Sequence, residues 1–403
     1  MINVAILGFG TVGSGVAEVL TTNGALIDQR VGEQVRVKYI VDIRDFPDSP
    51  YKDLFEKDFS VVEADPEVNV VVETIGGAKI ALDFTTRALK AGKSVVTSNK
   101  ELVATHGYEL LQLAKEHGCN YLFEASVGGG IPVLRPMSNC LAANQIEEVT
   151  GILNGTTNYI LTRMIRAGLS FDQALKEAQA NGYAEQDPTA DVDGHDACRK
   201  TCILAALAFG QHVYPEQVPT QGIRDVTLED VAYADSCGYK IKLLGRCMQT
   251  QEGKICAFTA PHLVEGSNPL AGVEDVFNAI AIHGNAVGDV MFYGPGAGKL
   301  PTASAVVADV IDLAKDLKSD RRNAWGPGAP DLVVSSDILS SRWYVRAQMS
   351  MEAARAAFHD LQPLARSGAP AGEVAFLTGA MTEPELRQRL QGVEVSSMFR
   401  VLA

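Results

Sequence analysis

A run of carboxylates that ends in a lysine carries the clearest chemical pattern in the sequence. The carboxylates before Lys200 are Glu185, Asp187, Asp191, Asp193 and Asp196. Asp196 and Lys200 stand four residues apart, so on a helix both side chains lie on one face. Apolar residues continue this face, which predicts that it points inward: Ile203, Leu204 and Leu207. A buried acid–lysine pair is costly unless partnered and is typical of a catalytic site, but a helix cap or a solvated ion pair has the same spacing.

The chain around this run is predicted to fold as helix, loop and helix. Ser170 and Gln173 have the spacing of a capping box, which opens a helix. Asn181-Gly182 ends it, because glycine can take the left-handed conformation that a helix end needs. A polar loop follows, and the second helix begins near Asp193. A calcium loop is excluded because the carboxylates do not alternate ahead of the glycine and no glutamate closes the loop.

Composition narrows the class of protein. With 403 residues and a net charge of −14, the chain is long enough for two or three domains. The acidic balance argues against nucleic acid and anionic membranes as partners, which leaves a small-molecule substrate. No apolar stretch has transmembrane length, and no signal peptide is recognisable. Seven cysteines without a CxxC pair predict a reducing, cytoplasmic location, and the histidines lack the spacing of a zinc site.

A glycine-rich motif follows the first apolar run, Val4–Leu7. It comprises Gly8, Phe9, Gly10, Thr11, Val12 and Gly13. Between a strand and a helix, glycines in this pattern allow a tight turn and let a pyrophosphate approach a helix N-terminus. Further strands are predicted over residues 35–41, 68–73 and 94–97. The alternation of strands and helices predicts an α/β fold whose N-terminal part is a Rossmann-type, doubly wound parallel sheet.

Three residues at strand ends bear on the cofactor. Asp42 would accept a hydrogen bond from a ribose hydroxyl, as in NAD sites, whereas Arg44 would accommodate the 2′-phosphate of NADP. Both are present, and the sequence leaves the choice open with a lean toward NADP. Lys100 follows the strand at 94–97, at the edge where such sheets bind ligands. It is alternatively a surface lysine that begins a helix.

Two glycine-rich stretches are less specific. EASVGGGIP begins at Glu124 after a strand predicted over residues 120–124. It exposes carbonyl oxygens that, with this carboxylate, suit a hard cation, although a plain turn would look the same. The stretch 294–310 lacks the phosphate-loop pattern, because Tyr293 replaces its first glycine and Leu300 its Ser or Thr. We expect it to turn at Gly298 into a helix that returns to the cofactor.

Six motifs, taken together and in order over residues 1–325, resemble the homoserine dehydrogenase family. They are GFGTVG, TSNKE, EASVGGGIP, NGTTNYI (154–160), GYAEQDPTADVDGHDACRK (182–200) and GPGAGKLPTASAV. The resemblance implies NAD(P)H-dependent, reversible reduction of L-aspartate 4-semialdehyde to L-homoserine, in threonine, methionine and isoleucine biosynthesis. It implies a Rossmann domain of residues 1–125 with 298–325. It also implies an α+β domain of residues 126–297 for substrate binding and dimerisation, in a homodimer or homotetramer.

Carried over residue by residue, the family pattern assigns roles. Lys200 is the acid/base at the substrate oxygen, Asp196 lies beside it, and Lys100 contacts substrate and nicotinamide. The amino-acid end of the substrate is held by Glu185, Asp191, Gly182 and Thr156. The cofactor is bound by the residues of GFGTVG and by Arg44, Lys100 and Gly298. A monovalent cation, Na⁺ or K⁺, is bound by Glu124 and by backbone carbonyls of Val127, Gly129 and Ile131.

The C-terminal residues 335–403 resemble a shortened ACT regulatory domain, a small α+β module. The expected order is strand, helix, strand, helix, strand, over residues 343–349, 352–365, 373–379, 383–390 and 397–402. The usual proline–glycine turn after the first strand is replaced by Met349-Ser350-Met351-Glu352, so L-threonine should inhibit weakly or not at all.

The sequence is also compatible with other functions. The chain starts at the Rossmann strand, which predicts a monofunctional enzyme without a kinase module. Alternatives are another amino-acid-linked NAD(P) oxidoreductase or a non-catalytic NADP-sensing protein. An acylating semialdehyde dehydrogenase is disfavoured because no cysteine sits in a nucleophile motif.

Overall fold

The computed structural model describes residues 1–317 and 325–402. Residues 318–324, which belong to the expected 298–325 segment, and Ala403 lie outside the described residues. The chain divides into two compact units. The first unit is formed by residues 1–146, 202–215 and 284–329. The second is formed by residues 147–201, 216–283 and 330–403.

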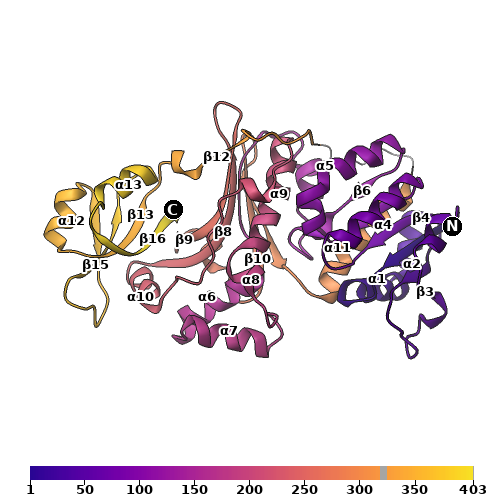
Figure 1. Cartoon of the computed structure of the whole chain (residues 1–403), viewed down its shortest axis with the longest axis horizontal. Coiled ribbons are helices and arrows are strands. Elements are labelled where there is room, and N and C mark those ends of the chain that lie inside the picture. The colour runs from indigo at the N-terminus through magenta and orange to yellow at the C-terminus, as the bar shows by residue number, and fades with distance from the viewer. Residues whose placement is uncertain (318–324, 403) are drawn as a thin grey trace. The chain divides into compact units, whose positions relative to one another are not determined.

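A six-stranded parallel sheet forms the centre of the first unit, in the order β3-β2-β1-β4-β5-β6 (Figure 1). Its strands are β1 (Ile2–Leu7), β2 (Val35–Val41), β3 (Phe55–Glu56), β4 (Val68–Glu73), β5 (Ser94–Thr97) and β6 (Tyr121–Leu122). The predicted parallel sheet is therefore confirmed, with β2, β4 and β5 at the predicted residues. The last strand is shorter than predicted because Glu124 already belongs to a 3₁₀ turn, η2 (Glu124–Ser126). The short strand β3 was not predicted.

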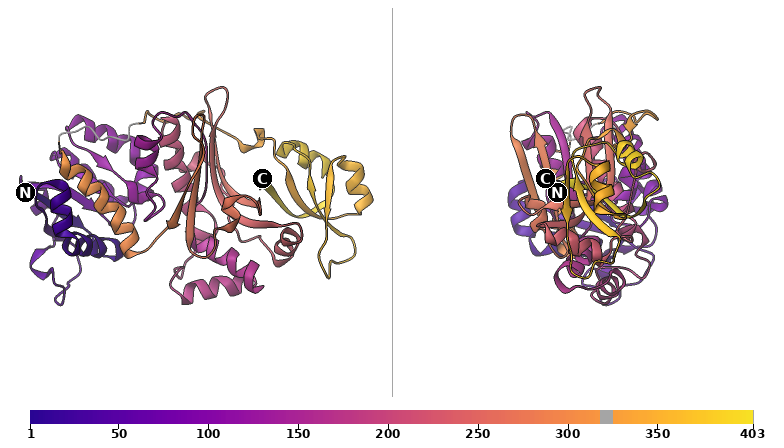
Figure 2. Two further views of the ribbon diagram at one scale, coloured as in Figure 1. Left: turned by 180° about the vertical axis from the view of Figure 1, so that it is seen from behind. Right: turned by 90° about the vertical axis from the view of Figure 1, so that its left-hand side faces the viewer.

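Alternation along the strands places helices on both faces of this sheet. Val4, Ile6, Val70 and Val72 pack in one core with apolar residues of α1, α2 and α11 (Figures 1 and 2). The strand residues between them are also buried and face α4 and α5. The helices and turns of this unit are α1 (Thr11–Thr22), α2 (Gly24–Val31), η1 (Lys52–Leu54), α3 (Ser60–Ala64), α4 (Lys79–Lys90), α5 (Lys100–Glu116), the π-helix η3 (Pro136–Cys140) and α11 (Lys299–Lys315), with strand β11 (Gly288–Pro295).

The helix predicted after Gly298 is α11, and it does return to the parallel sheet. A Cβ atom at Gly15 of α1 would lie 2.8 Å from the carbonyl oxygen of Lys299, so the two helices approach too closely for any larger residue. Ala303 and Val306 of α11 complete the core beneath β1. A segment almost 300 residues from the N-terminus thus finishes the N-terminal fold.

The second unit is built on a mixed sheet in which strands run in the order β10-β7-β8-β9-β16-β13-β15-β14, with β12 also paired to β9. β9 is parallel to both β16 and β12. The pairs β7–β8, β8–β9, β16–β13, β13–β15 and β15–β14 are antiparallel. The strands are β7 (Ile146–Ile152), β8 (Tyr239–Gln249), β9 (Ile255–Glu265), β10 (Phe277–Gly284), β12 (Val333–Val334), β13 (Trp343–Gln348), β14 (Leu361–Leu364), β15 (Glu373–Thr378) and β16 (Glu394–Leu402). The remaining helices and turns are α6 (Gly155–Ala167), α7 (Phe171–Ala180), α8 (Thr189–Val192), α9 (His195–Phe209), η4 (Pro215–Gln217), α10 (Leu228–Ser236), η5 (Pro269–Gly272), η6 (Ser336–Ile338), α12 (Met351–Ala357) and α13 (Glu383–Arg389).

The C-terminal strands differ from the prediction at one element. Residues 352–365 were predicted as one helix, but α12 ends at Ala357 and residues 361–364 form β14. Pro363 has no N–H to donate and would break a helix, whereas an edge strand tolerates it. The resulting order is β-α-β-β-α-β with strands arranged β16-β13-β15-β14, the ferredoxin-like arrangement.

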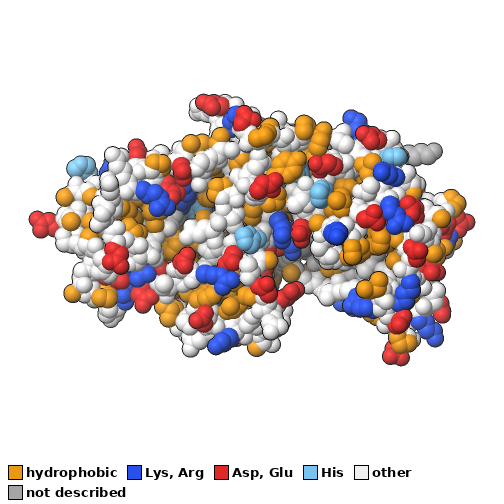
Figure 3. All heavy atoms as spheres, in the orientation of Figure 1, with side chains coloured by type: hydrophobic (Ala, Val, Ile, Leu, Met, Phe, Trp, Pro, Cys, Tyr) orange, Lys and Arg blue, Asp and Glu red, His pale blue; other side chains and the backbone are white. Residues whose placement is uncertain are grey.

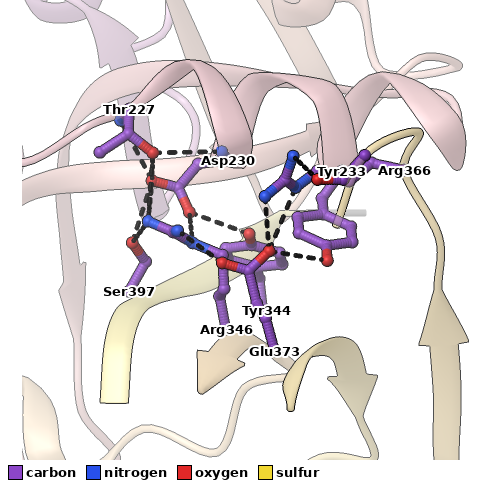
Figure 4. A network of polar contacts seen from close by, with 9 residues as sticks. Thr227, Asp230, Tyr233, Tyr344, Arg346, Arg366, Glu373 and Ser397 are labelled. Carbon is purple, nitrogen blue, oxygen red and sulfur yellow. Dashed lines mark hydrogen bonds and ion pairs between the residues drawn. The ribbon is translucent and has the colours of Figure 1, made fainter. Parts of the chain in front are cut away.

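A buried ionic network fixes these strands to α10 (Figure 4). Asp230 of α10 is fully buried, and its Oδ1 atom accepts hydrogen bonds from Arg346 Nε at 2.8 Å and from the Tyr344 hydroxyl at 2.9 Å. Its Oδ2 atom accepts one from the Ser397 hydroxyl at 2.9 Å. Arg346 and Tyr344 belong to β13 and Ser397 to β16, so one carboxylate collects donors from two strands.

The network continues to β15 through a second carboxylate. Arg346 also contacts Glu373, with Nη1 3.2 Å from Oε2. Glu373 accepts from Arg366 Nη2 at 2.7 Å and from the Tyr233 hydroxyl at 3.1 Å. Since Tyr233 again belongs to α10, the helix is tied to three of the four C-terminal strands.

The surface is mixed in character. On the face drawn in Figure 3, Lys and Arg side chains are interspersed with Asp and Glu and with apolar side chains. Among the described residues, no helix is both long enough and apolar enough to cross a membrane.

The network predicts a large stability effect. Asp230→Ala leaves the Arg346 guanidinium buried beside fewer acceptors, and breaking a buried ion pair costs about 3–5 kcal/mol. We expect urea denaturation to show a loss of free energy of unfolding of that size. Asp235→Asn, on the same helix but in an exposed pair with Lys240, should cost under about 1 kcal/mol. Equal losses in the two variants would show that the network contributes no more than a surface pair.

Candidate active site

The glycine-rich turn after β1 has the geometry of a dinucleotide cradle. Gly8 has φ +87°, and a Cβ atom at Gly13 would lie 1.9 Å from the Gly8 carbonyl oxygen, so both positions require glycine. Gly10 is the N-cap residue of α1, and a Cβ there would meet no described atom within 4 Å. The open side of the turn and the first N–H groups of α1 fit the pyrophosphate of a nicotinamide dinucleotide.

The two residues that bear on cofactor choice contact each other. Both oxygens of Asp42 accept hydrogen bonds from the Arg44 guanidinium, at 3.0 and 2.9 Å. The Asp42 carboxylate also accepts from the backbone N–H groups of Arg44 and Phe9. The Arg44 guanidinium therefore holds the pKa of Asp42 well below its usual value. The carboxylate is fully committed, while the Arg44 side chain stays 59% exposed.

Lys100 is the first residue of α5 and follows the carboxyl end of β5. The preceding residue, Asn99, caps the helix by accepting a hydrogen bond from the Leu102 N–H at 3.0 Å. Lys100 itself is half-buried. Gly298, at the N-terminus of α11, has φ +120°, which again favours glycine.

Lys200 and Asp196 form the pair that their spacing predicted. On α9 the Lys200 Nζ atom lies 2.7 Å from Asp196 Oδ2 and donates a second hydrogen bond, also 2.7 Å, to the Leu153 carbonyl. The two residues are 7% and 4% exposed. The predicted inward orientation is confirmed, and the solvated ion pair is excluded. Leu153 lies between β7 and α6, so a distant segment fixes the ammonium.

Asn154 joins two of the carboxylates and was not singled out from the sequence. Its amide Nδ2 donates to Asp191 Oδ1 at 2.7 Å and to Asp196 Oδ2 at 2.8 Å. Its Oδ1 atom caps α6 by accepting from the Thr157 N–H. The NGTT sequence indicates only a helix cap. Nothing in it shows that the side-chain nitrogen of Asn154 contacts Asp191 and Asp196, which lie 37 and 42 residues further along the chain.

The remaining acidic residues have different surroundings. Asp193 pairs with the exposed Arg224. Asp187 contacts the side chain and the backbone N–H of Thr189, and both contacts lower the pKa of Asp187. Glu185 is exposed, and its carboxylate makes no hydrogen bond or ion pair with a described residue. It is thus the carboxylate most available to a ligand.

The elements around these acids match the predicted pattern with one addition. The capping box of Ser170 and Gln173 is formed and opens α7, and Gly182 follows the helix with φ +75°. The Thr156 hydroxyl donates to the Tyr183 carbonyl at 2.6 Å and so ties α6 to the turn after α7. The predicted polar loop contains the short helix α8.

Glu124 has an unexpected set of partners. Its carboxylate accepts backbone N–H groups at 2.6, 3.0 and 2.7 Å from Val133, Leu134 and Arg135. A carboxylate has about four lone-pair sites, so little acceptor capacity is left. The carbonyl oxygens of Val127, Gly129 and Ile131 accept no hydrogen bond from the part of the chain that the structure describes. These three residues are buried, and carbonyl oxygens are ligands of hard cations.

Comparison with known proteins identifies the family. A model described as "Homoserine dehydrogenase" matches residues 132–311, and one described as "Homoserine dehydrogenase, NAD binding domain" matches residues 8–124. The homoserine dehydrogenase of Bacillus subtilis is 43% identical over 322 residues, 79% of this chain and 74% of that protein. The chain belongs to the homoserine dehydrogenase family.

Solved structures agree with this assignment. The crystal structure of a homoserine dehydrogenase from Thiobacillus denitrificans has a TM-score of 0.90 at 34% identity and covers all of this chain and 98% of that one. A hyperthermophilic archaeal homoserine dehydrogenase in complex with NADPH has a TM-score of 0.65 at 31% identity, over 77% of this chain and 97% of that one.

Membership in the homoserine dehydrogenase family confirms the resemblance seen in the motifs and sets the chemistry. The enzyme is an NAD(P)-dependent oxidoreductase that acts on a CH–OH group, linking L-homoserine to L-aspartate 4-semialdehyde. The predicted cofactor and cation residues, with Lys100, lie in the first unit. The predicted substrate residues, with Lys200 and Asp196, lie in the second. No group of three or more His, Cys, Asp or Glu side chains within the described ranges is arranged to hold a metal ion.

Proposed function

We propose that Lys200 is the acid/base of the homoserine dehydrogenase reaction in this chain. The observation that carries the proposal is its buried ammonium, held by Asp196 and the Leu153 carbonyl. The nicotinamide cofactor, when bound, supplies hydride to the aldehyde carbon or accepts it from the alcohol. A neighbouring ammonium can stabilise the resulting alkoxide oxygen and protonate it. In the reverse direction the same lysine, as the neutral amine, takes the hydroxyl proton.

Asp196 and Asn154 act through the lysine in this proposal. A buried ammonium tends to lose its charge unless an anion compensates for the lost hydration. Asp196 supplies that anion, and the Asn154 amide holds the Asp196 oxygen that contacts Lys200. The Asn154 amide and the Lys200 ammonium therefore share one oxygen of Asp196, which fixes the direction of the lysine side chain.

The amino-acid end of the substrate belongs with the acidic turn. An ammonium group on the substrate calls for carboxylate acceptors. Glu185 is exposed and its carboxylate has no described partner, and Asp191 is oriented by Asn154. The backbone at Gly182 and the Thr156 hydroxyl adjoin the same turn. We assign substrate binding to these four residues, Glu185, Asp191, Gly182 and Thr156.

For the cofactor we propose NADP over NAD. The Asp42 carboxylate is occupied by Arg44 and the Phe9 N–H, so it has little capacity left for a ribose hydroxyl. The exposed guanidinium of Arg44 suits a phosphate. The NADPH complex of the archaeal relative supports the same choice. Lys100 and Gly298 complete the proposed cofactor site with the glycine-rich turn.

A monovalent cation is proposed beside Glu124. The uncommitted carbonyl oxygens of Val127, Gly129 and Ile131 support it, whereas the Glu124 carboxylate is mostly engaged by backbone N–H groups. The backbone oxygens would therefore carry most of the binding, and Glu124 would fix the shape of the turn.

The C-terminal strands are proposed to be an ACT-like module with a packing role. The β-α-β-β-α-β order supports this. The turn after β13 is filled by a helix cap, in which the Ser350 hydroxyl accepts from the Ala353 N–H at 3.1 Å. Weak or absent inhibition by L-threonine stays a prediction. A homodimer or homotetramer also stays a proposal. So does a cytoplasmic location, which the seven cysteines support because none of them forms a disulfide.

Removal of the Lys200 ammonium tests the proposed acid/base. General acid–base groups contribute about 10²–10⁴-fold, so Lys200→Ala should lower kcat for homoserine oxidation by that factor while NADPH fluorescence titration shows unchanged binding. If the variant kept more than about a tenth of the wild-type kcat, the proton donor would have to be another group.

Charge removal at Arg44 tests the cofactor proposal. A hydrogen bond to a charged group contributes about 1.5–3 kcal/mol, so Arg44→Ala should raise the KM for NADP by about 10-fold or more and leave the KM for NAD nearly unchanged. An equal rise in the KM values for NADP and NAD would assign Arg44 a structural role at the end of β2.

Replacement of the medium cation tests the ion site. Rates in sodium or potassium salts should exceed those in a bulky organic cation at equal ionic strength, because only a small ion fits among carbonyl oxygens. Identical rates in all three media would contradict a functional ion site.

A further inference from the structure

The carboxyl end of β4 holds a buried acid outside the site described so far. Glu73 is the last residue of β4 and is fully buried. In the sheet register it stands between Leu7, at the end of β1, and Thr97, at the end of β5. The chain order reverses between β1 and β4, and ligands of such sheets bind outside the strand ends at that point. Glu73 therefore lies directly beneath the proposed cofactor site.

Its carboxylate joins the two loops above it. One oxygen accepts from the Ile75 N–H at 2.6 Å, and the other accepts from the Thr97 hydroxyl at 2.6 Å. The Thr97 hydroxyl in turn accepts from the Asn99 N–H at 2.9 Å. The Asn99 amide donates back to the carbonyls of Ile75 and Gly77. Glu73 is thus a fully buried member of a closed ring of hydrogen bonds.

Each side of this ring leads to a proposed ligand-binding element. On the β4 side, Thr74 donates from its hydroxyl to the carbonyls of Leu7 and Gly8. A Cβ at Gly8 would lie 3.0 Å from the Thr74 carbonyl oxygen, so the loop after β4 shapes the glycine-rich turn. On the β5 side, Asn99 caps α5, whose first residue is Lys100.

We propose that Glu73 is a positioning residue that sets the glycine-rich turn and Lys100 in register with each other for hydride transfer. An apolar side chain would fill the same space but would leave the Ile75 N–H and the Thr97 hydroxyl without their acceptor. The part played by Lys100 rests on the proposed function. The contact with the glycine-rich turn does not.

The raised pKa of Glu73 agrees with a role in hydrogen bonding that does not need a negative charge. Burial raises the pKa of Glu73 to about 7, against the effect of its hydrogen bonds. Glu73 also acts on Tyr121 of β6, whose pKa is raised well above its usual value by burial and by the Glu73 charge. A carboxyl group that is readily neutral can be replaced by an amide of the same shape, which accepts from Ile75 and donates to Thr97.

Two substitutions at Glu73 separate geometry from charge. Glu73→Leu should lower kcat for homoserine oxidation by about 10- to 100-fold, the cost of a displacement of about 1 Å in a reacting group. It should also weaken NADPH binding, measured by cofactor fluorescence. Glu73→Gln should keep both close to wild type. If Glu73→Leu does not fold, Thr97→Val, which removes the hydroxyl of the ring at almost constant shape, carries the same test.

A control lies at the opposite end of the same strand pair. Lys93 is buried before β5 and donates to the carbonyls of Asp65 and Val68, so it ties β4 to β5 at their amino ends. Lys93→Met should lower the melting temperature without changing kcat or NADPH affinity. If Glu73→Leu behaves in the same way, Glu73 only stabilises the fold and the proposal is wrong.

A double-variant cycle tests the route through Lys100. In a Lys100→Ala background, Glu73→Leu should cause little further loss of kcat, because residues that act as a unit are not additive. Full additivity would overturn that route. Near-complete turnover by Lys200→Ala would refute the proposed function, yet NADPH titration of Glu73→Leu and Glu73→Gln would still decide whether Glu73 shapes the cofactor turn.

Discussion

A lysine ammonium with almost no exposure to water is the constraint around which the second unit is arranged. Lys200 loses most of its hydration, and an ion of that kind persists only where an anion and further acceptors replace the water. Asp196 and the Leu153 carbonyl do so at 2.7 Å each. Asn154 then holds Asp196, and α6 begins at the residue after Asn154. The start of α6 and the first turn of α9 are therefore fixed relative to each other by the needs of one charge.

The first unit meets a related requirement with backbone and buried polar groups at the carboxyl edge of its sheet. Glycines remove side chains from the turn at residues 8–13, so that N–H groups of α1 are exposed to a ligand. Beneath the turn, Leu7, Glu73 and Thr97 form a row across the ends of β1, β4 and β5. Glu73 in this row bonds to the loop after β4 and to Thr97 at the end of β5. Ligand binding at this edge depends on which backbone N–H groups have no partner within the protein. The buried side chains determine this, because they bond to the other backbone groups.

The C-terminal strands illustrate how a sheet edge can be covered within one chain. β16 pairs in parallel with β9, so the C-terminal strands continue the sheet that carries β7 and β8. The buried ion pair between Asp230 and Arg346 joins α10 to β13. An unpaired edge of this length would be open to pairing with other chains. The arrangement agrees with a structural part for these residues.

The sequence by itself determined whatever depends on neighbours a few residues apart. Strands at 35–41, 68–73 and 94–97, the capping box at Ser170 and the Asp196–Lys200 pair follow from alternation or helical spacing, and the structure contains all of them. The family motifs added the reaction. One local signal was overlooked, since Pro363 marks the end of a helix that the prediction carried through to residue 365.

Only the tertiary structure decided the partners of the polar side chains. Asn154 reads as a helix cap, Glu73 as a strand end, Asp42 as a ribose ligand and Glu124 as a cation ligand until their hydrogen-bond partners are known. Those partners stand from 2 to 42 residues away in the sequence, and local periodicity does not encode which of them contacts the side chain. The physical reason is that a buried polar group must take whatever partner the packed chain brings to it, so its role is fixed by the fold as a whole.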